Sequence, residues 1–178
     1  MLNSWLRAAN PFNAPRGMLE AERAGRVMVF GLLATSVMSV IQAAVSAMHP
    51  EWMATLMNNQ YDRMGLSGQE LETQQAIMST VMGPLMTIGS IIGVVIYLVL
   101  AWAQWKYVTR AIPIIVLAMT AYSALMGVLA LATGQYSGLA TAYVVLVGVT
   151  WVVSCVCILL HVASLRGAWM FHRLKQEP

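Results

Sequence analysis

The stretch Ala111–Thr133 reads AIPIIVLAMTAYSALMGVLALAT and contains no charged residue. A helix needs about 20 consecutive, mainly apolar residues to cross the hydrocarbon core of a bilayer. A membrane-spanning strand needs about 9–11 residues of alternating polarity instead. Because this stretch is long and does not alternate, it predicts a transmembrane helix.

Three other stretches have the same character. Val27–Met48 and Ile77–Trp105 contain no charge, and Thr141–Leu165 is interrupted only by His161 near its end. The fold class predicted is therefore all-α, a polytopic integral membrane protein with four transmembrane helices and amphipathic interfacial segments. The predicted organisation is a juxtamembrane segment 1–26, a transmembrane domain 27–165 and a basic tail 166–178, with spans at about 27–48, 77–105, 111–133 and 141–165 and a loop at 49–76.

Composition supports this class. The 178 residues are 59% hydrophobic and 10% charged, whereas soluble domains carry roughly 25% charged residues. A soluble enzyme, a nucleic-acid-binding domain and a disordered chain are all excluded on this ground. The two cysteines exclude a disulfide framework, and the apolar run after residue 26 is too long for a cleavable signal peptide.

The basic residues predict an orientation, since positive charge accumulates on the cytoplasmic side of a membrane. Four basic residues precede the first span, two lie between the second and third, and three follow the fourth. Arg63 alone lies on the other side, in a loop with four acidic residues. We expect a bacterial inner-membrane protein with both termini in the cytoplasm and with the lipid bilayer as its nearest partner.

Two segments outside the spans have amphipathic character. In the N-terminal segment, a helix starting at about Pro15 is expected to run straight into the first span. In the loop, a helix is predicted to start at Pro50 and to end at Gly65, although Asn58–Gln60 interrupt its apolar pattern; Ser67 and Glu70 then fit a capping box. Aromatic residues expected to anchor the chain at the membrane surfaces are Trp5, Phe12, Trp52, Trp105 and Trp169.

Glycine and proline residues predict further features of the spans. Gly83-Pro84 falls inside the second span, where proline removes a helical hydrogen bond and kinks the axis. Small residues let membrane helices approach closely, either within the chain or between chains. The helix-packing positions predicted are Gly89, Gly93, Gly127 and Gly148.

The spans offer little chemistry. None carries Asp, Glu, Lys or Arg in its middle, which argues against a proton-coupled transporter. His161 shares a helix face with Cys157, but one His and one Cys fall short of a metal site. No catalytic or phosphate-binding motif is present, so we expect neither an enzyme nor a cofactor or metal.

The layout of the chain resembles small bacterial members of the Yip (Ypt-interacting protein) membrane-protein family. The stretches that carry the resemblance are Asn10–Arg16, Met82–Leu85, Trp105–Pro113 and His161–Gly167. The resemblance implies a helical membrane fold and no catalytic residue. Eukaryotic members of the family bind small GTPases and shape membranes.

Three functions are compatible with these features. The first is a non-catalytic accessory or scaffold protein, which binds other membrane subunits or itself and has no nucleic-acid partner. The alternative is a small oligomeric transporter or channel for a neutral solute, with its path lined by Thr87, Ser90, Thr120 and Ser123. The third is a pigment- or haem-associated subunit that uses His161 as a ligand.

Overall fold

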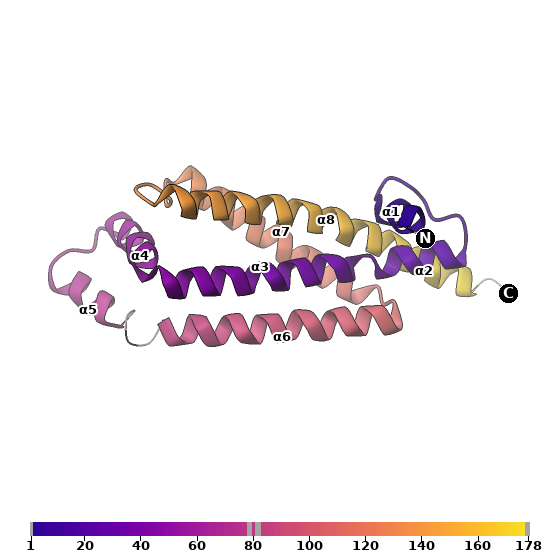
Figure 1. Ribbon diagram of the computed structural model, residues 1–178, viewed down its shortest axis with the longest axis horizontal. Coiled ribbons are helices and arrows are strands. Elements are labelled where there is room, and N and C mark those ends of the chain that lie inside the picture. Colours follow the sequence, from indigo (N-terminus) through magenta and orange to yellow (C-terminus); the bar gives the residue numbers. More distant parts are fainter. Residues whose placement is uncertain (1, 78–79, 81–82, 177–178) are drawn as a thin grey trace.

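The computed structural model describes residues 2–77, 80 and 83–176 (Figure 1). These residues form eight helices and no strand. The helices are α1 (Leu2–Ala9), α2 (Met18–Arg26), α3 (Met28–Met48), α4 (Pro50–Met64), α5 (Gln69–Ile77), α6 (Gly83–Tyr107), α7 (Ala111–Ala132) and α8 (Thr141–Gln176).

Four helical stretches are long and apolar enough to cross a membrane, as the sequence predicts. They are Met18–Met48, Ile88–Tyr107, Ala111–Ala132 and Thr141–Gln176. The first combines α2 and α3, because Val27 between them keeps right-handed helical angles. The expected continuation of the N-terminal helix into the first span is therefore confirmed.

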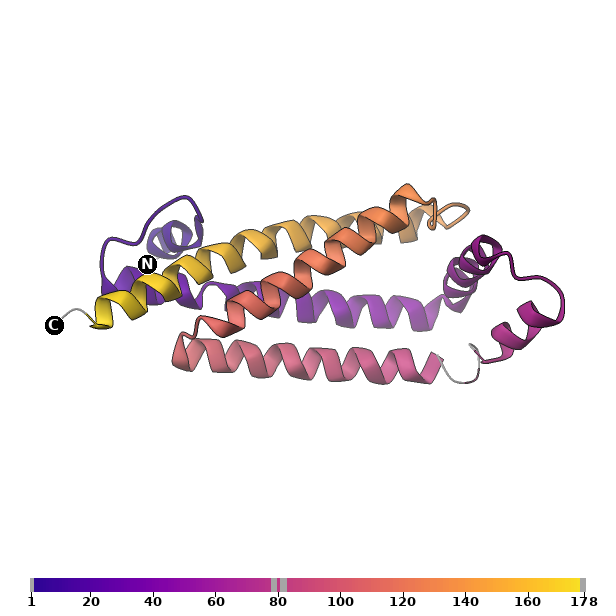
Figure 2. The ribbon, with the colours of Figure 1, turned by 180° about the vertical axis from the view of Figure 1, so that it is seen from behind.

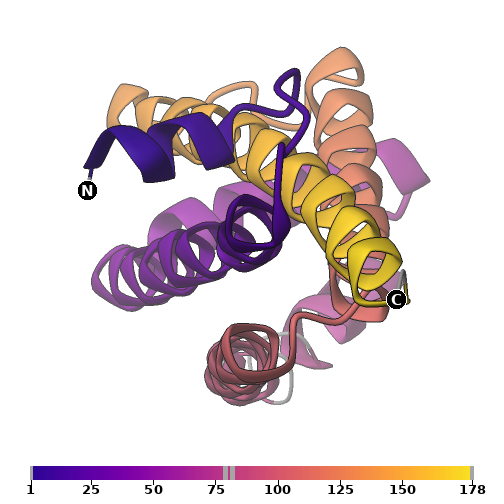
Figure 3. The ribbon, with the colours of Figure 1, turned by 90° about the vertical axis from the view of Figure 1, so that its right-hand side faces the viewer.

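The long helices lie roughly side by side, with α3 between α6 and α8 and with α7 packed against α8 (Figures 2 and 3). Residues 108–110 join α6 to α7, and the two helices diverge from this turn (Figure 2). We call the end with both termini and the α6–α7 turn the terminal end. The opposite end, with α4, α5 and the α7–α8 turn, is the distal end.

The predicted loop 49–76 holds two helices. α4 runs through Asn58–Gln60 to Met64 and ends at Gly65 as predicted, and the left-handed angles there (φ 68°) favour glycine. Asn58 and Asn59 are tolerated because their amides bond to neighbouring segments. α5 begins later than the capping box predicts, and the Gly68 carbonyl, not that of Ser67, accepts the first helical bond, from Glu72 N–H.

The start of the second span lies partly outside the described part of the chain. α5 ends at Ile77 and α6 is described from Gly83, and residues 78, 79, 81 and 82 between them are among those that the structure does not describe. The predicted kink at Gly83-Pro84 depends on these residues, so it stays a prediction. At the other end of the chain, the predicted tail from Arg166 to Gln176 is the last part of α8.

The best-buried apolar residues are in the terminal half of the molecule. Met28, Val29 and Leu32 of α3 pack with Ala101 of α6 and Val116 of α7. The helices are close together here and separate towards the distal end, where the candidate site lies.

Candidate functional site

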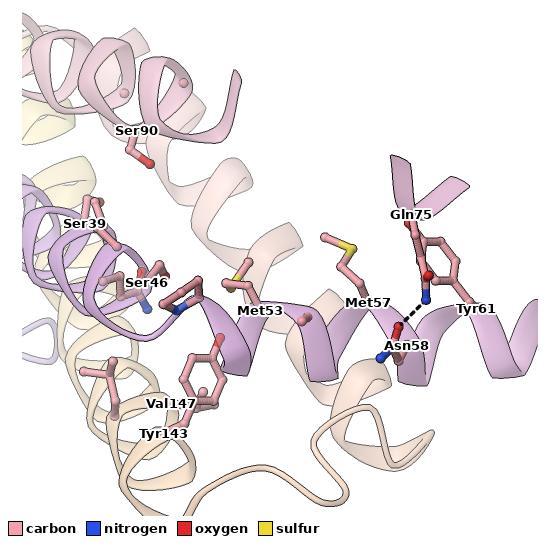
Figure 4. Close-up of a pocket in the computed structure, with 18 of the residues that line it drawn as sticks. Ser39, Ser46, Met53, Met57, Asn58, Tyr61, Gln75, Ser90, Tyr143 and Val147 are labelled. Atoms are coloured by element: carbon pink, nitrogen blue, oxygen red, sulfur yellow. Dashed lines mark hydrogen bonds between the residues drawn. The ribbon is translucent and has the colours of Figure 1, made fainter. Parts of the chain in front are cut away.

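A cavity of about 1180 Å³ lies among the helices towards the distal end (Figure 4). This volume exceeds the roughly 300–1,000 Å³ of common small-molecule pockets. α3, α4, α5, α6 and α8 contribute its described lining residues, and α7 contributes none of them. The site is therefore large, and its walls come from segments far apart in the sequence.

α4 closes the cavity at the distal end and is held there by side chains. Asn59 Nδ2 donates to the carbonyl oxygens of Gln135 (3.1 Å) and Ser137 (2.8 Å) in the α7–α8 turn. Arg63 Nη1 donates to Thr133 Oγ1 (2.7 Å). Hydrogen bonds to a charged donor are stronger than those between neutral groups. These contacts fix α4 against the end of the helices.

Further contacts attach α4 to α5. Gln75 Nε2 donates to Asn58 Oδ1 (3.1 Å; Figure 4), and the Tyr61 hydroxyl donates to the Gln74 carbonyl (3.4 Å). Asn58, Tyr61 and Gln75 all line the cavity. The distal wall is thus a small network of amide and phenol groups.

The cavity walls are polar in places but uncharged. Described lining residues include serine, asparagine, glutamine and tyrosine, and none is Asp, Glu, Lys, Arg or His. Within the described part of the chain, the hydroxyls of Ser46, Tyr97 and Tyr143 have no hydrogen-bond partner. Met53 and Met57 add flexible, polarisable surface (Figure 4). Such walls suit an uncharged molecule with a few hydrogen-bonding groups.

The predicted packing glycines divide into two kinds. Gly89 and Gly93 line the cavity, and a Cβ added at either would meet no atom within 4 Å. The described chain therefore packs nothing against this pair, and Gly148 is equally open. A Cβ at Gly127 would lie 2.7 Å from the Trp151 ring, so this glycine does allow close packing of α7 on α8.

The residues predicted to line a path are only partly brought together. Ser90 lines the cavity. The Thr120 hydroxyl instead donates to the Val116 carbonyl of its own helix (2.8 Å), and Ser123 is not among the described lining residues. The side chain of Thr87 is outside the described part of the structure.

His161 lies away from the cavity, enclosed between α3 and α8 with 1% of its surface exposed. A Cβ at Gly31 would be 3.0 Å from His161 Cε1. Cys157, one turn earlier, donates from Sγ to the Gly31 carbonyl (3.4 Å). His161 Nδ1 has no hydrogen-bond partner, but the packing leaves no open face for a haem or pigment. Among the described residues, no group of three His, Cys, Asp or Glu side chains could hold a metal.

A buried polar cluster at the terminal end was not predicted. Gln104, fully buried, donates from Nε2 to the carbonyls of Gly25 (2.7 Å) and Thr109 (3.2 Å). Its Oε1 accepts from the backbone N–H (3.2 Å) and hydroxyl (3.1 Å) of Thr109. Ser164, also fully buried, donates to the same Gly25 carbonyl (2.6 Å). The cluster joins α2, the α6–α7 turn and α8.

Two glycines allow α2 to come this close to α8 and to the α6–α7 turn. A Cβ at Gly167 would lie 2.6 Å from the Ala24 carbonyl carbon, and one at Gly25 would press on Val108. The signal for this contact is present in the sequence, since Ala21 and Gly25 on one helix, and Ala163 and Gly167 on the other, follow the small-x-x-x-small pattern.

The predicted aromatic anchors occupy both ends. At the terminal end the Trp5 ring stacks on the Trp105 ring (6.0 Å between centroids) and meets the Phe30 ring edge to face (5.7 Å). The Arg110 guanidinium lies over the Trp169 ring (4.7 Å). At the distal end Trp52 contacts the ring of Tyr143 (5.6 Å). Phe12 is 84% exposed.

Comparison with protein-family models, curated proteins and solved structures finds no match for this chain. The resemblance to the Yip family therefore stays a prediction, and the function has to be argued from the cavity itself.

Proposed function

We propose that this protein is a membrane-embedded binding protein, of the carrier or transporter class, that holds an uncharged molecule in the distal cavity. The observation that carries the proposal is the 1180 Å³ cavity whose described lining residues include none that is charged. Charged ligands in a low-dielectric site need opposite charges or metal ions to offset their desolvation. An uncharged ligand needs only apolar walls and a few hydrogen bonds.

The same cavity weakens the scaffold interpretation that the sequence favours. That interpretation rests in part on Gly89 and Gly93 as close-packing residues, within the chain or against another transmembrane helix. α4 lies across the distal end of the cavity that these glycines line. A partner helix running along this face of α6 would meet α4, whereas a compact molecule would not.

Native mass spectrometry of the protein, purified in mild detergent, tests the proposal. We expect a non-covalent small-molecule adduct on the wild type that is lost in Gly93→Leu, because the leucine side chain would occupy cavity volume. Gly148→Leu is the matched control, since Gly148 is equally open but does not line the cavity. A wild type without adduct, or an adduct that survives in Gly93→Leu, would contradict the proposal.

An accessory subunit is the second candidate, and the divergence of α6 and α7 favours it. α6 packs on α3 and α7 packs on α8, so both present long apolar faces. A neighbouring protein could complete this incomplete bundle. The same native mass spectra separate the two candidates, because a stoichiometric second chain supports the accessory role and an adduct-bearing single chain supports the carrier.

We also propose that the terminal end faces the cytoplasm of a bacterial cell, across the inner membrane. The support is the distribution of charge: the basic residues of α2, the α6–α7 turn and the end of α8 meet at the terminal end, while Arg63 is at the distal end. Reporter fusions at the C-terminus and in the α7–α8 turn should report opposite sides of the membrane. A C-terminal fusion that reports the periplasm would overturn this orientation.

A further inference from the structure

We propose that the ligand of the distal cavity is an uncharged lipid that enters from the side, with its polar head at α4–α5 and its apolar chain between α3 and α6. This inference rests on the proposed binding function and names its ligand class. It follows from three properties of the cavity: where it is closed, where it is open and how its polar groups are distributed.

The closed side is the distal end. The hydrogen bonds of Asn59 and Arg63 hold α4 against the α7–α8 turn, and the Asn58–Gln75 contact holds it to α5. A water-soluble molecule that approached along the helix axes from this end would have to displace these contacts. The terminal end is closed by the close packing of α2 on α8 and by the Gln104 cluster.

The open side is lateral. A Cβ at Gly89 or Gly93 would meet no atom within 4 Å, and α7 supplies none of the described lining residues. α6 and α7 diverge from their shared turn (Figure 2), which together with the lining points to an opening between helices and not along them. Gly89 and Gly93 belong to the apolar stretch Ile88–Tyr107, so when this stretch spans a bilayer the molecules that reach the opening first are lipids.

The polar groups are unequally distributed within the cavity. Asn58, Tyr61 and Gln75 are gathered at the distal wall, with the unpartnered Ser46 and Tyr143 hydroxyls next to α4 (Figure 4). The walls away from it are alanines of α3, the two glycines of α6 and some polar side chains. Of these polar side chains, Ser39 already donates to Thr35 and Gln42 to Thr150, while the Tyr97 hydroxyl has no described partner. An unpaired hydroxyl in an apolar environment is costly, so these groups favour a ligand with hydroxyl or carbonyl oxygens at one end.

The absence of charge among the described lining residues favours uncharged lipids over anionic ones. A phosphatidylglycerol headgroup carries a negative charge that no described lining residue would neutralise. A diacylglycerol has the same chains and glycerol ester carbonyls, with a neutral hydroxyl in place of the phosphate. The cavity therefore fits the diacylglycerol type of lipid and not the anionic type.

Photo-crosslinking tests this assignment on the full chain in phosphatidylcholine nanodiscs. The probes are a diacylglycerol and a phosphatidylglycerol that carry the same diazirine-labelled acyl chain. We expect the diacylglycerol to label cavity residues of α3 and α6, and unlabelled diacylglycerol, but not phosphatidylglycerol, to compete. Gly93→Leu should lower this labelling about ten-fold or more, the change that a methylene-sized misfit produces in an apolar pocket, while Gly148→Leu should not.

Three results would overturn the inference: equal cavity labelling by both probes, labelling confined to outward faces of the helices, or undiminished labelling in Gly93→Leu. Gly89→Leu replaces Gly93→Leu if the latter fails to fold, and the competition measurement needs no variant. A native adduct that Gly93→Leu removes, without cavity labelling by diacylglycerol, would leave the binding function standing and reject the lipid. If the adduct is absent as well, the binding function itself fails.

Discussion

The helices pack closely at the terminal end of this molecule and stand apart at its distal end. At the terminal end Gly25 and Gly167 bring α2 and α8 into backbone contact, and a buried glutamine joins them to the α6–α7 turn. At the distal end α3, α6 and α8 stand apart around a cavity. The role of a glycine in these helices therefore depends on what a Cβ at its position would touch. At Gly167 that is backbone, and at Gly93 it is open space.

The largest test of this comparison is Gly167→Ala. The new Cβ would lie 2.6 Å from the Ala24 carbonyl carbon, and backbone cannot move aside as a flexible side chain can. We expect a loss of about 3 kcal/mol in the free energy of unfolding, the upper part of the usual cost of overpacking. Reversible unfolding in mixed detergent micelles, followed by circular dichroism, measures it.

Gly148→Ala is the matched control for that substitution. Its Cβ would meet nothing within 4 Å, and alanine is a better helix former than glycine by up to about 1 kcal/mol. The control should therefore be neutral or stabilising. Equal losses in the two variants would show that the contact between α2 and α8 is not what holds the terminal end together.

A smaller effect is expected from Gln104→Leu. The substitution removes four hydrogen bonds and leaves the partly buried Thr109 N–H without its partner. The cost of a buried unsatisfied group predicts a loss of about 2 kcal/mol. The Gly25 carbonyl keeps its bond from Ser164, which limits the damage. The same unfolding measurement applies.

Gln42→Leu, in the cavity half of α3, is the comparison variant. Gln42 Nε2 donates to Thr150 Oγ1 (3.0 Å), but this hydroxyl also bonds to the Leu146 carbonyl (2.9 Å). Losing one side-chain bond between membrane helices costs on average about 0.6 kcal/mol. If Gln42→Leu destabilised as strongly as Gln104→Leu, the difference between the two ends would be rejected.

Features of this molecule that depend on local sequence could be predicted, and those that depend on contacts between distant segments could not. The four long helices depend on local composition, so uninterrupted apolar runs predict them. The end of α4 at Gly65 depends on one residue's backbone freedom, and the sequence also predicts it. The partners that the Asn58 and Asn59 amides find on α5 and on the α7–α8 turn could not be predicted, because these segments are distant in the sequence.

The cavity and the Gln104 cluster depend on the relative placement of helices, which no single helix specifies. Small-x-x-x-small pairs occur at Ala21/Gly25, Gly89/Gly93 and Ala163/Gly167, and the pattern alone does not tell which of them meet. Gly89 and Gly93 form the more familiar Gly-x-x-x-Gly pair, yet no described atom would lie within 4 Å of a Cβ at either position. Gln104 appears in the sequence only as a lone amide in an apolar run, so its partners could not be inferred.

Gly93→Leu tests whether the distal end is as loosely packed as the cavity implies. Because the new side chain enters open space, we expect the free energy of unfolding to change by no more than about 0.5 kcal/mol, as for substitutions away from packed contacts. Its effect should be on binding instead. A destabilisation comparable to that of Gly167→Ala would mean that α6 is packed on this face and that the cavity is closed in solution.

The smallest effect concerns pH at the start of α4, where His49 Nδ1 and Glu51 Oε1 are 2.9 Å apart and the His49 ring stacks on Trp52 (4.1 Å between centroids). Hydrogen bonding to the backbone N–H of Glu51, and then to His49, lowers the pKa of this carboxyl below its ordinary value. A depressed pKa in the folded state means that the carboxylate stabilises the fold above the unfolded-state pKa of about 4.3. That contribution is lost as the pH falls through the lower, folded-state value.

Trp52 fluorescence should therefore change in this acidic range in the wild type and stay flat in Glu51→Gln. Since both side chains are exposed and α4 is also held by Asn59 and Arg63, the change should remain local. Loss of bound ligand in the same pH range would instead couple the start of α4 to the cavity that it closes.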